Sequence, residues 1–269
     1  MLSLCRYVFL LGILPMLVGC LPSDNSATSP ETLVAVSMLP PGSVLPSGES
    51  CAEQVQAQGQ TFEHRELNIP YNQTIGHTLP TDFFNTPYAN DTRANTEIAS
   101  QVDGNFTGST DEILRWAACK WGIDPDLVRA LATNESWWRQ RLRNNWTTHC
   151  PDRHPPGSDD VTRPDECHRD YGILQLNYEF FDAVWPGMAD STAMNVDTVL
   201  AVIRTCYEGY QLWLHNVAPP DRPYVAGDIW GCLGRYRSGG WYDTTAINYM
   251  HNVQNYLIER RWEQPYFDD

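Results

Sequence analysis

Glu135 occupies a position that its chemistry makes unusual. It continues a row set by Leu127 and Leu131 at intervals of four residues, so the three side chains share one face of a predicted helix. A carboxylate on an apolar face is costly unless it is paired or neutral, and partial burial raises its pKa. We therefore identify Glu135 as a candidate general acid near neutral pH. The alternative is that the helix frays here and leaves Glu135 solvated.

A second group of polar residues brackets an apolar run at 170–177. Gly172 permits close approach of the backbone to a neighbour. If the segment is extended, Gln175 and Asn177 lie on one face and offer amide groups to the hydroxyl or acetamido groups of a ligand. A buried strand is the alternative explanation of the same pattern.

The elements that must position these residues are predicted helices. Ser109 and Glu112 have the spacing of a capping box, and Asp124 followed by Pro125 is typical of an N-cap and first helical position. Apolar periodicity predicts three further helices, at 197–216, 225–236 and 244–262. Together these helices predict one domain over 109–264, with an irregular extension at 51–108 that lies against it.

The first 50 residues have the composition of an export signal and a linker. Arg6 precedes an apolar run from Tyr7 to Val18, which ends at Gly19-Cys20. LVGC at 17–20 resembles the lipobox of bacterial lipoproteins, in which the signal (here 1–19) is removed and the cysteine acylated. We therefore expect Cys20 to carry lipid and 20–50, rich in Ser, Pro, Thr and Gly, to be a flexible tether. An ordinary signal peptide with a chance cysteine is the alternative.

The cysteines are consistent with export. The chain has eight; Cys5 lies in the signal and Cys20 is the predicted lipid site, which leaves an even number. We expect the pairs Cys51–Cys119, Cys150–Cys167 and Cys206–Cys232, although the even number alone leaves other pairings open. Zinc is an alternative for the histidines near Cys150 and Cys167, but an oxidising compartment favours a disulfide, so no metal is expected.

The charge excludes one class of function. Lys and Arg number 18 against 33 Asp and Glu, a formal net charge of −15. Nucleic-acid binding requires basic patches, so we expect no nucleic-acid partner. The same balance offers no general attraction to a polyanionic cell wall, but a lipid tether would hold the protein near it.

Four short segments carry a family resemblance over roughly 110–262. They are DPDLVRA at 124–130 leading to Glu135-Ser136, GILQ at 172–175, RYRSG at 235–239 and YMHNV at 249–253. In type and order they resemble the Glu-Ser helix, the Gly-Leu-Met-Gln and Ala-Tyr-Asn-Ala-Gly segments and the closing Tyr-Val-x-x-Val helix of soluble-lytic-transglycosylase domains, in the lysozyme superfamily. Arg237 departs from the pattern, because the family has asparagine there.

The resemblance implies a mainly α, lysozyme-like fold with a small β or loop element near 140–177. It implies cleavage of the β-1,4 bond between N-acetylmuramic acid and N-acetylglucosamine in peptidoglycan. Glu135 would act as acid and then base, and the muramic C6 hydroxyl would close on C1 to give a 1,6-anhydro end. Substrate contacts are expected from Ser136, Trp138, Gln175, Asn177, Tyr236 and Tyr249. Trp137, Trp185 and Trp241 are further candidates for stacking on sugars, and no cofactor is implied.

Two other functions remain open. DYGILQ at 170–175 also resembles animal-type lysozymes, in which that aspartate is the second catalytic carboxylate. Asp170 could therefore make the protein a muramidase-type hydrolase. The third possibility is a non-catalytic peptidoglycan-binding lipoprotein. In every case the expected partners are glycan strands and, through lipid, a membrane at the cell envelope, on the outer membrane or a periplasmic face.

Overall fold

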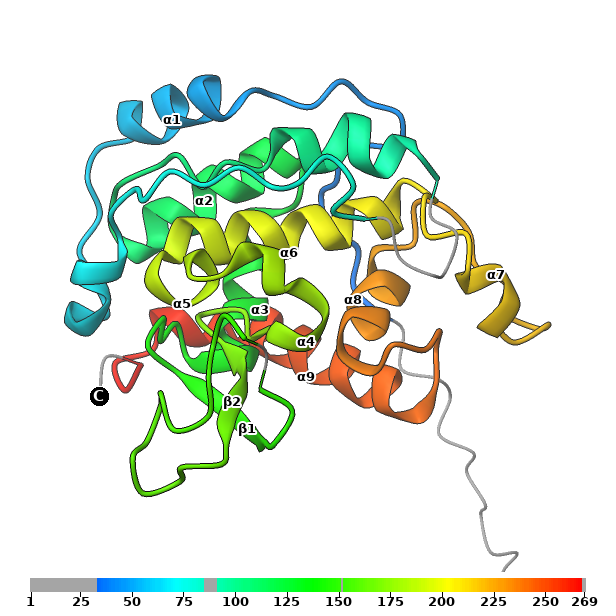
Figure 1. Ribbon diagram of the computed structural model, residues 1–269. Helices are drawn as coiled ribbons and strands as arrows, with labels where there is room; N and C mark the ends of the chain where they lie inside the picture. The colour runs from blue at the N-terminus through cyan, green and yellow to red at the C-terminus, as the bar shows by residue number, and fades with distance from the viewer. Residues whose placement is uncertain (1–32, 85–90, 151, 268–269) are drawn as a thin grey trace, which may run out of the picture. The chain divides into compact units, whose positions relative to one another are not determined.

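The computed structural model describes residues 33–84, 91–150 and 152–267 (Figure 1). The predicted signal peptide, the predicted lipidation site Cys20 and the first part of the predicted tether lie outside these residues. Residues 33–269 form one unit, and everything below concerns its described part. No helix in that part has both the length and the apolar character required to cross a membrane.

The described elements are mostly helical, as predicted. The helices are α1 (Gly48–Ala57), α2 (Thr110–Trp121), α3 (Pro125–Ser136), α4 (Tyr178–Phe181), α5 (Gly187–Asp190), α6 (Thr192–Tyr207), α7 (Leu214–Val217), α8 (Ile229–Ser238) and α9 (Thr244–Glu259). The strands are β1 (Arg143–Thr147), β2 (Cys167–Tyr171) and β3 (Leu176–Asn177). Short 3-10 or π turns cover Glu66–Tyr71, Ala94–Ile98, Ala99–Gln101, Asp182–Val184 and Arg261–Glu263.

Helix α6 is the centre of the packing. Every one of its residues is buried, which is the mark of a helix surrounded by others. It contacts α2, α5 and α8, while α3 packs on α2 and α9, and α8 packs on α9 (Figure 1). The row that contains Leu127 and Leu131 on α3 is buried in this core, and Glu135 lies at the end of the same row.

Local capping explains where the first two core helices begin. Ser109 and Glu112 form the predicted capping box on α2, which ends at Gly122 in the left-handed conformation. Asp124 caps α3 through the backbone N–H of Asp126, with Pro125 in the first turn. Both predicted starts are confirmed.

The prediction of a helix over 197–216 is wrong at both ends. Helix α6 begins earlier because the Ser191 hydroxyl caps it, accepting from Met194 N at 3.1 Å. It ends at Tyr207, and Gly209 then adopts a φ of +85° that reverses the chain. The predicted helix from 225 starts only at Ile229, because Asp228 is its N-cap.

The predicted tether is too long. From residue 33 the chain already lies on the domain: Val34 N donates to Gln254 at 2.7 Å, and Met38 forms a bridge with Ile123. The fully buried Arg204 donates to the carbonyls of Leu39 (2.8 Å) and Pro40 (3.0 Å). Residues 33–47 therefore supply acceptors for a buried cation and are not a free linker.

The segment 51–108 is also more regular than predicted. Its start belongs to helix α1, which lies beside α2 in Figure 1. All three predicted disulfides are present: Cys51–Cys119 joins α1 to α2, Cys150–Cys167 closes the loop between β1 and β2, and Cys206–Cys232 joins α6 to α8.

The small sheet lies within the predicted 140–177 region. Its order is β1-β2-β3, and both pairings are antiparallel. Asp170 on the central strand is opposite Asn144 on β1 and Asn177 on β3. The register therefore surrounds this carboxylate with amide side chains.

Candidate active site

Glu135 lies in the last turn of α3, at the boundary between the core and solvent. The hydroxyl of Tyr249, on α9, donates a hydrogen bond to Glu135 Oε1. Tyr249 is itself buried, whereas Glu135 keeps partial exposure. The α3–α9 packing therefore holds this carboxyl next to a fixed donor without sealing it from a ligand.

The surroundings of Glu135 favour its protonated form. Burial raises its pKa to about 7, and the negative charge of Asp170 acts in the same direction. The hydrogen bond from Tyr249 and the positive charge of Arg237 oppose this rise. At neutral pH the group can therefore both give and take a proton, as an acid that becomes a base requires.

Asp170 is the second carboxylate of the cluster. It is 8% exposed, and its Oδ2 accepts a hydrogen bond from Asn145 Nδ2. Burial raises its pKa, while hydrogen bonds from Asn145 and Asn177 and the charges of Arg169 and Arg237 limit the rise. Asn145 was not predicted from the sequence, because neither the pairing of its neighbour Asn144 with Asp170 nor its own positive φ is visible in one sequence.

Two tyrosines link the helices to this cluster. Tyr236, on α8, donates its hydroxyl to Leu174 O at 2.6 Å and so ties that helix to the turn after β2. Burial and the charges of Glu135 and Asp170 raise the pKa of Tyr236 well above its usual value. The pKa of Tyr249 is raised in the same way, with burial first and Glu135 next. Both hydroxyls therefore stay protonated and remain donors.

The predicted amide contacts have local partners. The Gln175 side chain donates to Gly172 O at 2.7 Å and to Leu142 O at 3.3 Å, and accepts from Asn144 at 2.8 Å. Asn177 caps α4 by accepting from Glu179 N at 2.9 Å. Both side chains stay half-exposed beside Asp170, so their contact with a ligand stays a prediction.

The substrate contacts expected from Ser136 and Trp138 are wrong. Ser136 is 2% exposed and donates to Ile173 O at 2.7 Å, so its hydroxyl serves the packing of the turn after β2. Trp138 is 1% exposed, and its indole N–H donates to Arg129 O at 3.0 Å. The helix ends at Ser136, and Trp137 and Trp138 both have positive φ, which turns Trp138 into the core instead of along the helix face.

Of the other tryptophans expected to stack on sugar, one is too buried to do so and two keep this as a prediction. Trp241 is 2% exposed, so that expectation is wrong. Trp185 is half-buried against His154 and two tyrosines, and Trp137 packs on Phe267 at 5.6 Å. Stacking by these two stays a prediction.

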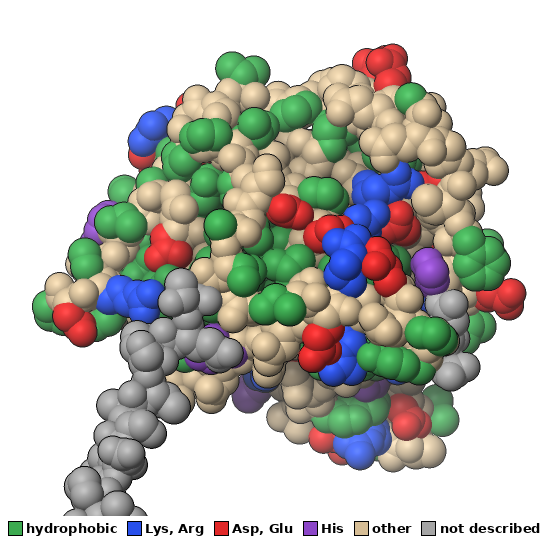
Figure 2. All heavy atoms as spheres, turned by 180° about the vertical axis from the view of Figure 1, so that it is seen from behind, with side chains coloured by type: hydrophobic (Ala, Val, Ile, Leu, Met, Phe, Trp, Pro, Cys, Tyr) green, Lys and Arg blue, Asp and Glu red, His purple; other side chains and the backbone are tan. Residues whose placement is uncertain are grey.

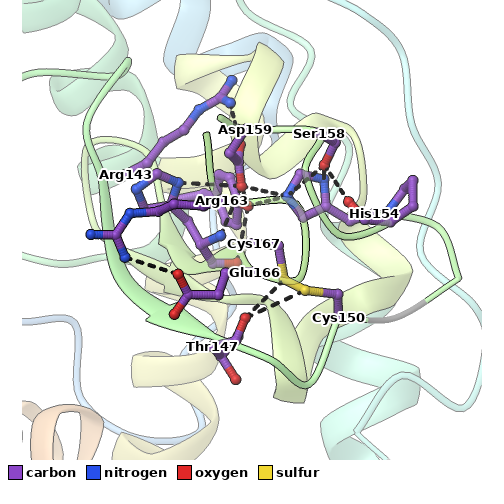
Figure 3. A network of polar contacts seen from close by, with 12 residues as sticks. Arg143, Thr147, Cys150, His154, Ser158, Asp159, Arg163, Glu166 and Cys167 are labelled. Carbon is purple, nitrogen blue, oxygen red and sulfur yellow. Dashed lines mark hydrogen bonds and ion pairs between the residues drawn. A yellow bond between two sulfur atoms is a disulfide. The ribbon is translucent and has the colours of Figure 1, made fainter. Parts of the chain in front are cut away.

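A second polar network lies in the disulfide-closed loop (Figure 3). The side chain of Asp159 is fully buried there. Its carboxylate accepts hydrogen bonds from His168 N (2.7 Å) and from the Tyr171 hydroxyl (2.8 Å). It also contacts His154 Nε2 at 2.7 Å and forms an ion pair with Arg143 at 2.5 Å. Burial opposes ionisation of Asp159, but these hydrogen bonds outweigh it and hold its pKa well below the usual range. The network stabilises the conformation of the loop, and Glu135 is not part of it.

Within the described residues, a metal cluster does not define the site. In the described part of the chain, no group of three or more His, Cys, Asp or Glu side chains could hold a metal ion. A hollow of about 310 Å³ lies elsewhere, between residues 60–73 and 107–112. Its Glu63 and Glu112 carboxylates are occupied by Asn72, Thr61 and neighbouring groups.

Comparison with known proteins identifies no relative. Neither a protein-family model, a curated protein nor a solved structure matches the chain. The cluster around Glu135 is therefore the basis for the function proposed below.

Proposed function

We propose that the protein cleaves peptidoglycan glycan strands between N-acetylmuramic acid and N-acetylglucosamine, as a lytic transglycosylase with a lysozyme-like fold. The observation that carries the proposal is the half-exposed Glu135, with a pKa raised to about 7 and a fixed hydrogen bond from Tyr249. The four segments that resemble the family supply the groups around it: α3, the turn 172–175, α8 and α9.

The chemistry follows from the proton on Glu135. The protonated carboxyl gives its proton to the glycosidic oxygen as the bond from that oxygen to the muramic C1 breaks, and N-acetylglucosamine leaves with a free hydroxyl. The Glu135 carboxylate then takes the proton of the muramic C6 hydroxyl while this oxygen bonds to C1. The product is a 1,6-anhydro ring, Glu135 is protonated again, and no water is consumed.

A muramidase-type hydrolysis is the second candidate, because Asp170 is electrostatically coupled to Glu135. Retaining hydrolases place two carboxyls about 5–5.5 Å apart and keep the second one ionised. Burial raises the pKa of Asp170, which disfavours the ionised form, while hydrogen bonds from Asn145 and Asn177 limit this rise. The net raised pKa favours a positioning role for Asp170, and hence the transglycosylase.

We also propose that the protein acts outside the cytoplasm, on the envelope side of a membrane, held by lipid on Cys20. The three disulfides support an oxidising compartment. A lipid anchor compensates for the net negative charge, which offers no attraction to an anionic wall.

Product analysis of digested, purified peptidoglycan tests this function. We expect muropeptides with anhydro ends, which are lighter by one water than the reducing products of a hydrolase. Reducing ends would favour the Asp170 mechanism instead. Binding to peptidoglycan without any product would leave only the non-catalytic wall-binding protein.

A further inference from the structure

Arg237 is an exposed cation at the edge of the Glu135 cluster. It lies in the last turn of α8, directly after Tyr236, whose hydroxyl is fixed on Leu174 O. Helix α8 packs on α9, the helix of Tyr249. The charge of Arg237 lowers the pKa of both Glu135 and Asp170, so the guanidinium lies within electrostatic reach of both carboxyls.

Arg237 lacks the carboxylate partner that many arginines in the described part of the chain have. Arginine–carboxylate pairs in the described part of the chain include Arg93–Asp91 (2.6 Å), Arg129–Asp111 (2.7 Å), Arg163–Glu166 (2.9 Å) and Arg115–Asp111 (3.0 Å). Figure 2 likewise shows basic side chains lying beside acidic ones on the rear face. Within the described residues, no hydrogen bond or ion pair engages the Arg237 side chain.

A lone cation at this point works against the acid. Glu135 must be protonated to act, yet the positive charge of Arg237 favours its ionised form. The conflict disappears once an anion binds the guanidinium, because the bound charge cancels the effect of Arg237 on Glu135. Binding of such a ligand would then also raise the protonated fraction of the acid.

We propose that Arg237 binds a carboxylate carried by the glycan substrate, beside the bond that Glu135 cleaves. This inference rests on the proposed function and names what distinguishes its substrate. N-acetylmuramic acid bears a lactyl group that is either a free carboxylate or the attachment point of a peptide stem with carboxylates of its own. A guanidinium binds a carboxylate through two parallel hydrogen bonds. Polymers of N-acetylglucosamine alone offer no such group.

Binding to inactive protein provides the test. Glu135→Gln blocks turnover, and three ligands of equal length are compared: glycan strands without stems, strands with stems, and N-acetylglucosamine oligomers. We expect the Glu135→Gln protein to prefer one carboxylate-bearing strand by about tenfold over the oligomers. Preference for the stemless strand identifies the lactyl carboxylate, and preference for the stemmed strand identifies the peptide.

Adding Arg237→Gln should abolish this preference and leave oligomer binding unchanged, while Arg237→Lys should restore part of it. Arg153→Gln is the matched control, since Arg153 is also exposed and its charge acts on Tyr178 instead of the cluster. An unchanged preference in Arg237→Gln overturns the assignment of Arg237 while the proposed function stands. Failure of every variant to bind any of the three ligands overturns the proposed function as well.

A pH profile separates recognition from a structural role. In otherwise wild-type protein, Arg237→Gln should move the alkaline limb of kcat/KM to higher pH, because the free protein loses the charge that holds the Glu135 pKa down. Tyr236, Tyr249 and Asp170 also face Glu135, and all three remain. A limb that does not move overturns the proposed placement of the guanidinium.

Discussion

The pKa values of two carboxyl groups in this protein, Asp159 and Glu135, are shifted in opposite directions. Asp159, in the disulfide-closed loop, has a fully buried side chain, yet its pKa lies well below the usual range. Glu135 keeps some exposure, yet its pKa is raised to about 7. Burial alone therefore does not decide the outcome, because it acts to raise the pKa of both groups.

The difference lies in the donors around each group. Asp159 has the backbone N–H of His168, the Tyr171 hydroxyl, His154 and the guanidinium of Arg143. Within the described residues, Glu135 has the hydroxyl of Tyr249 alone. Several donors stabilise the charged form, and one donor does not offset the loss of water. The loop thus has a structural anion, and the end of α3 has a group that can exchange a proton.

The largest effect on stability is expected at Asp159. Asp159→Asn removes a fully buried charge and weakens the hydrogen bonds made to it, and should lower the free energy of unfolding by about 3 kcal/mol, measured by urea denaturation at pH 7. Asp165→Asn, an exposed acid of the same loop, is the control and should change it by less than about 0.5 kcal/mol. Equal stabilities of the two variants would remove the structural role of the network.

The ionised carboxylate of Asp159 stabilises the fold, whereas ionisation of Glu135 should destabilise it. Between its unfolded pKa of 4.5 and its folded pKa of about 7, the folded state holds the proton more tightly, so stability falls as pH rises through this window. Glutamine does not ionise, so Glu135→Gln removes this fall in stability with rising pH. The variant should therefore gain roughly 2 kcal/mol over wild type on going from pH 5 to pH 8. Parallel pH dependences of the two proteins would contradict the raised pKa.

The hydrogen bond from Tyr249 sets how far the Glu135 pKa rises. Tyr249→Phe removes a donor that favours the carboxylate, so the alkaline limb of kcat/KM should shift upward by about one pH unit. Tyr256→Phe, on the same helix but against Trp137, is the control and should not shift it. A downward shift, or none, would show that the hydroxyl does not stabilise the ionised acid.

Asp170 is intermediate between the two carboxyls, with amide donors and a raised pKa. If it positions the site without reacting, Asp170→Asn should lower kcat by less than about tenfold and still give anhydro products. A loss of activity as large as that of the Glu135 variant would favour the two-carboxylate hydrolase.

Much of the scaffold was predictable, because its signals are local. The capping pairs Ser109–Glu112 and Asp124–Pro125 place α2 and α3, and the apolar period places Glu135 on its row. The three disulfides also have the predicted pairing. The caps and the apolar period depend on residues close in the chain, whereas the even count of cysteines indicates three disulfides without fixing their pairing.

The wrong predictions concern positions whose structure depends on more than the neighbouring residues in the sequence. Trp138 stands three residues after Glu135, which on a continuing helix would place both on one face, but the positive φ of Trp137 and Trp138 ends the helix and the indole is buried. Residues 33–47 have the composition of a linker, yet the buried Arg204 requires their carbonyls. Asn145 follows Asn144, the register partner of Asp170, and contacts Asp170 from a backbone with positive φ. None of these three features can be inferred from the local sequence.

The most direct test of the account is the rate of peptidoglycan cleavage by Glu135→Gln. Glutamine preserves the shape of the side chain and cannot give a proton, so we expect the release of soluble muropeptides to fall by about a thousandfold or more. Glycan binding should persist, and the variant should show the stability gain at alkaline pH that marks a folded protein. Release of the same products at the wild-type rate would contradict the assignment of Glu135 as the acid.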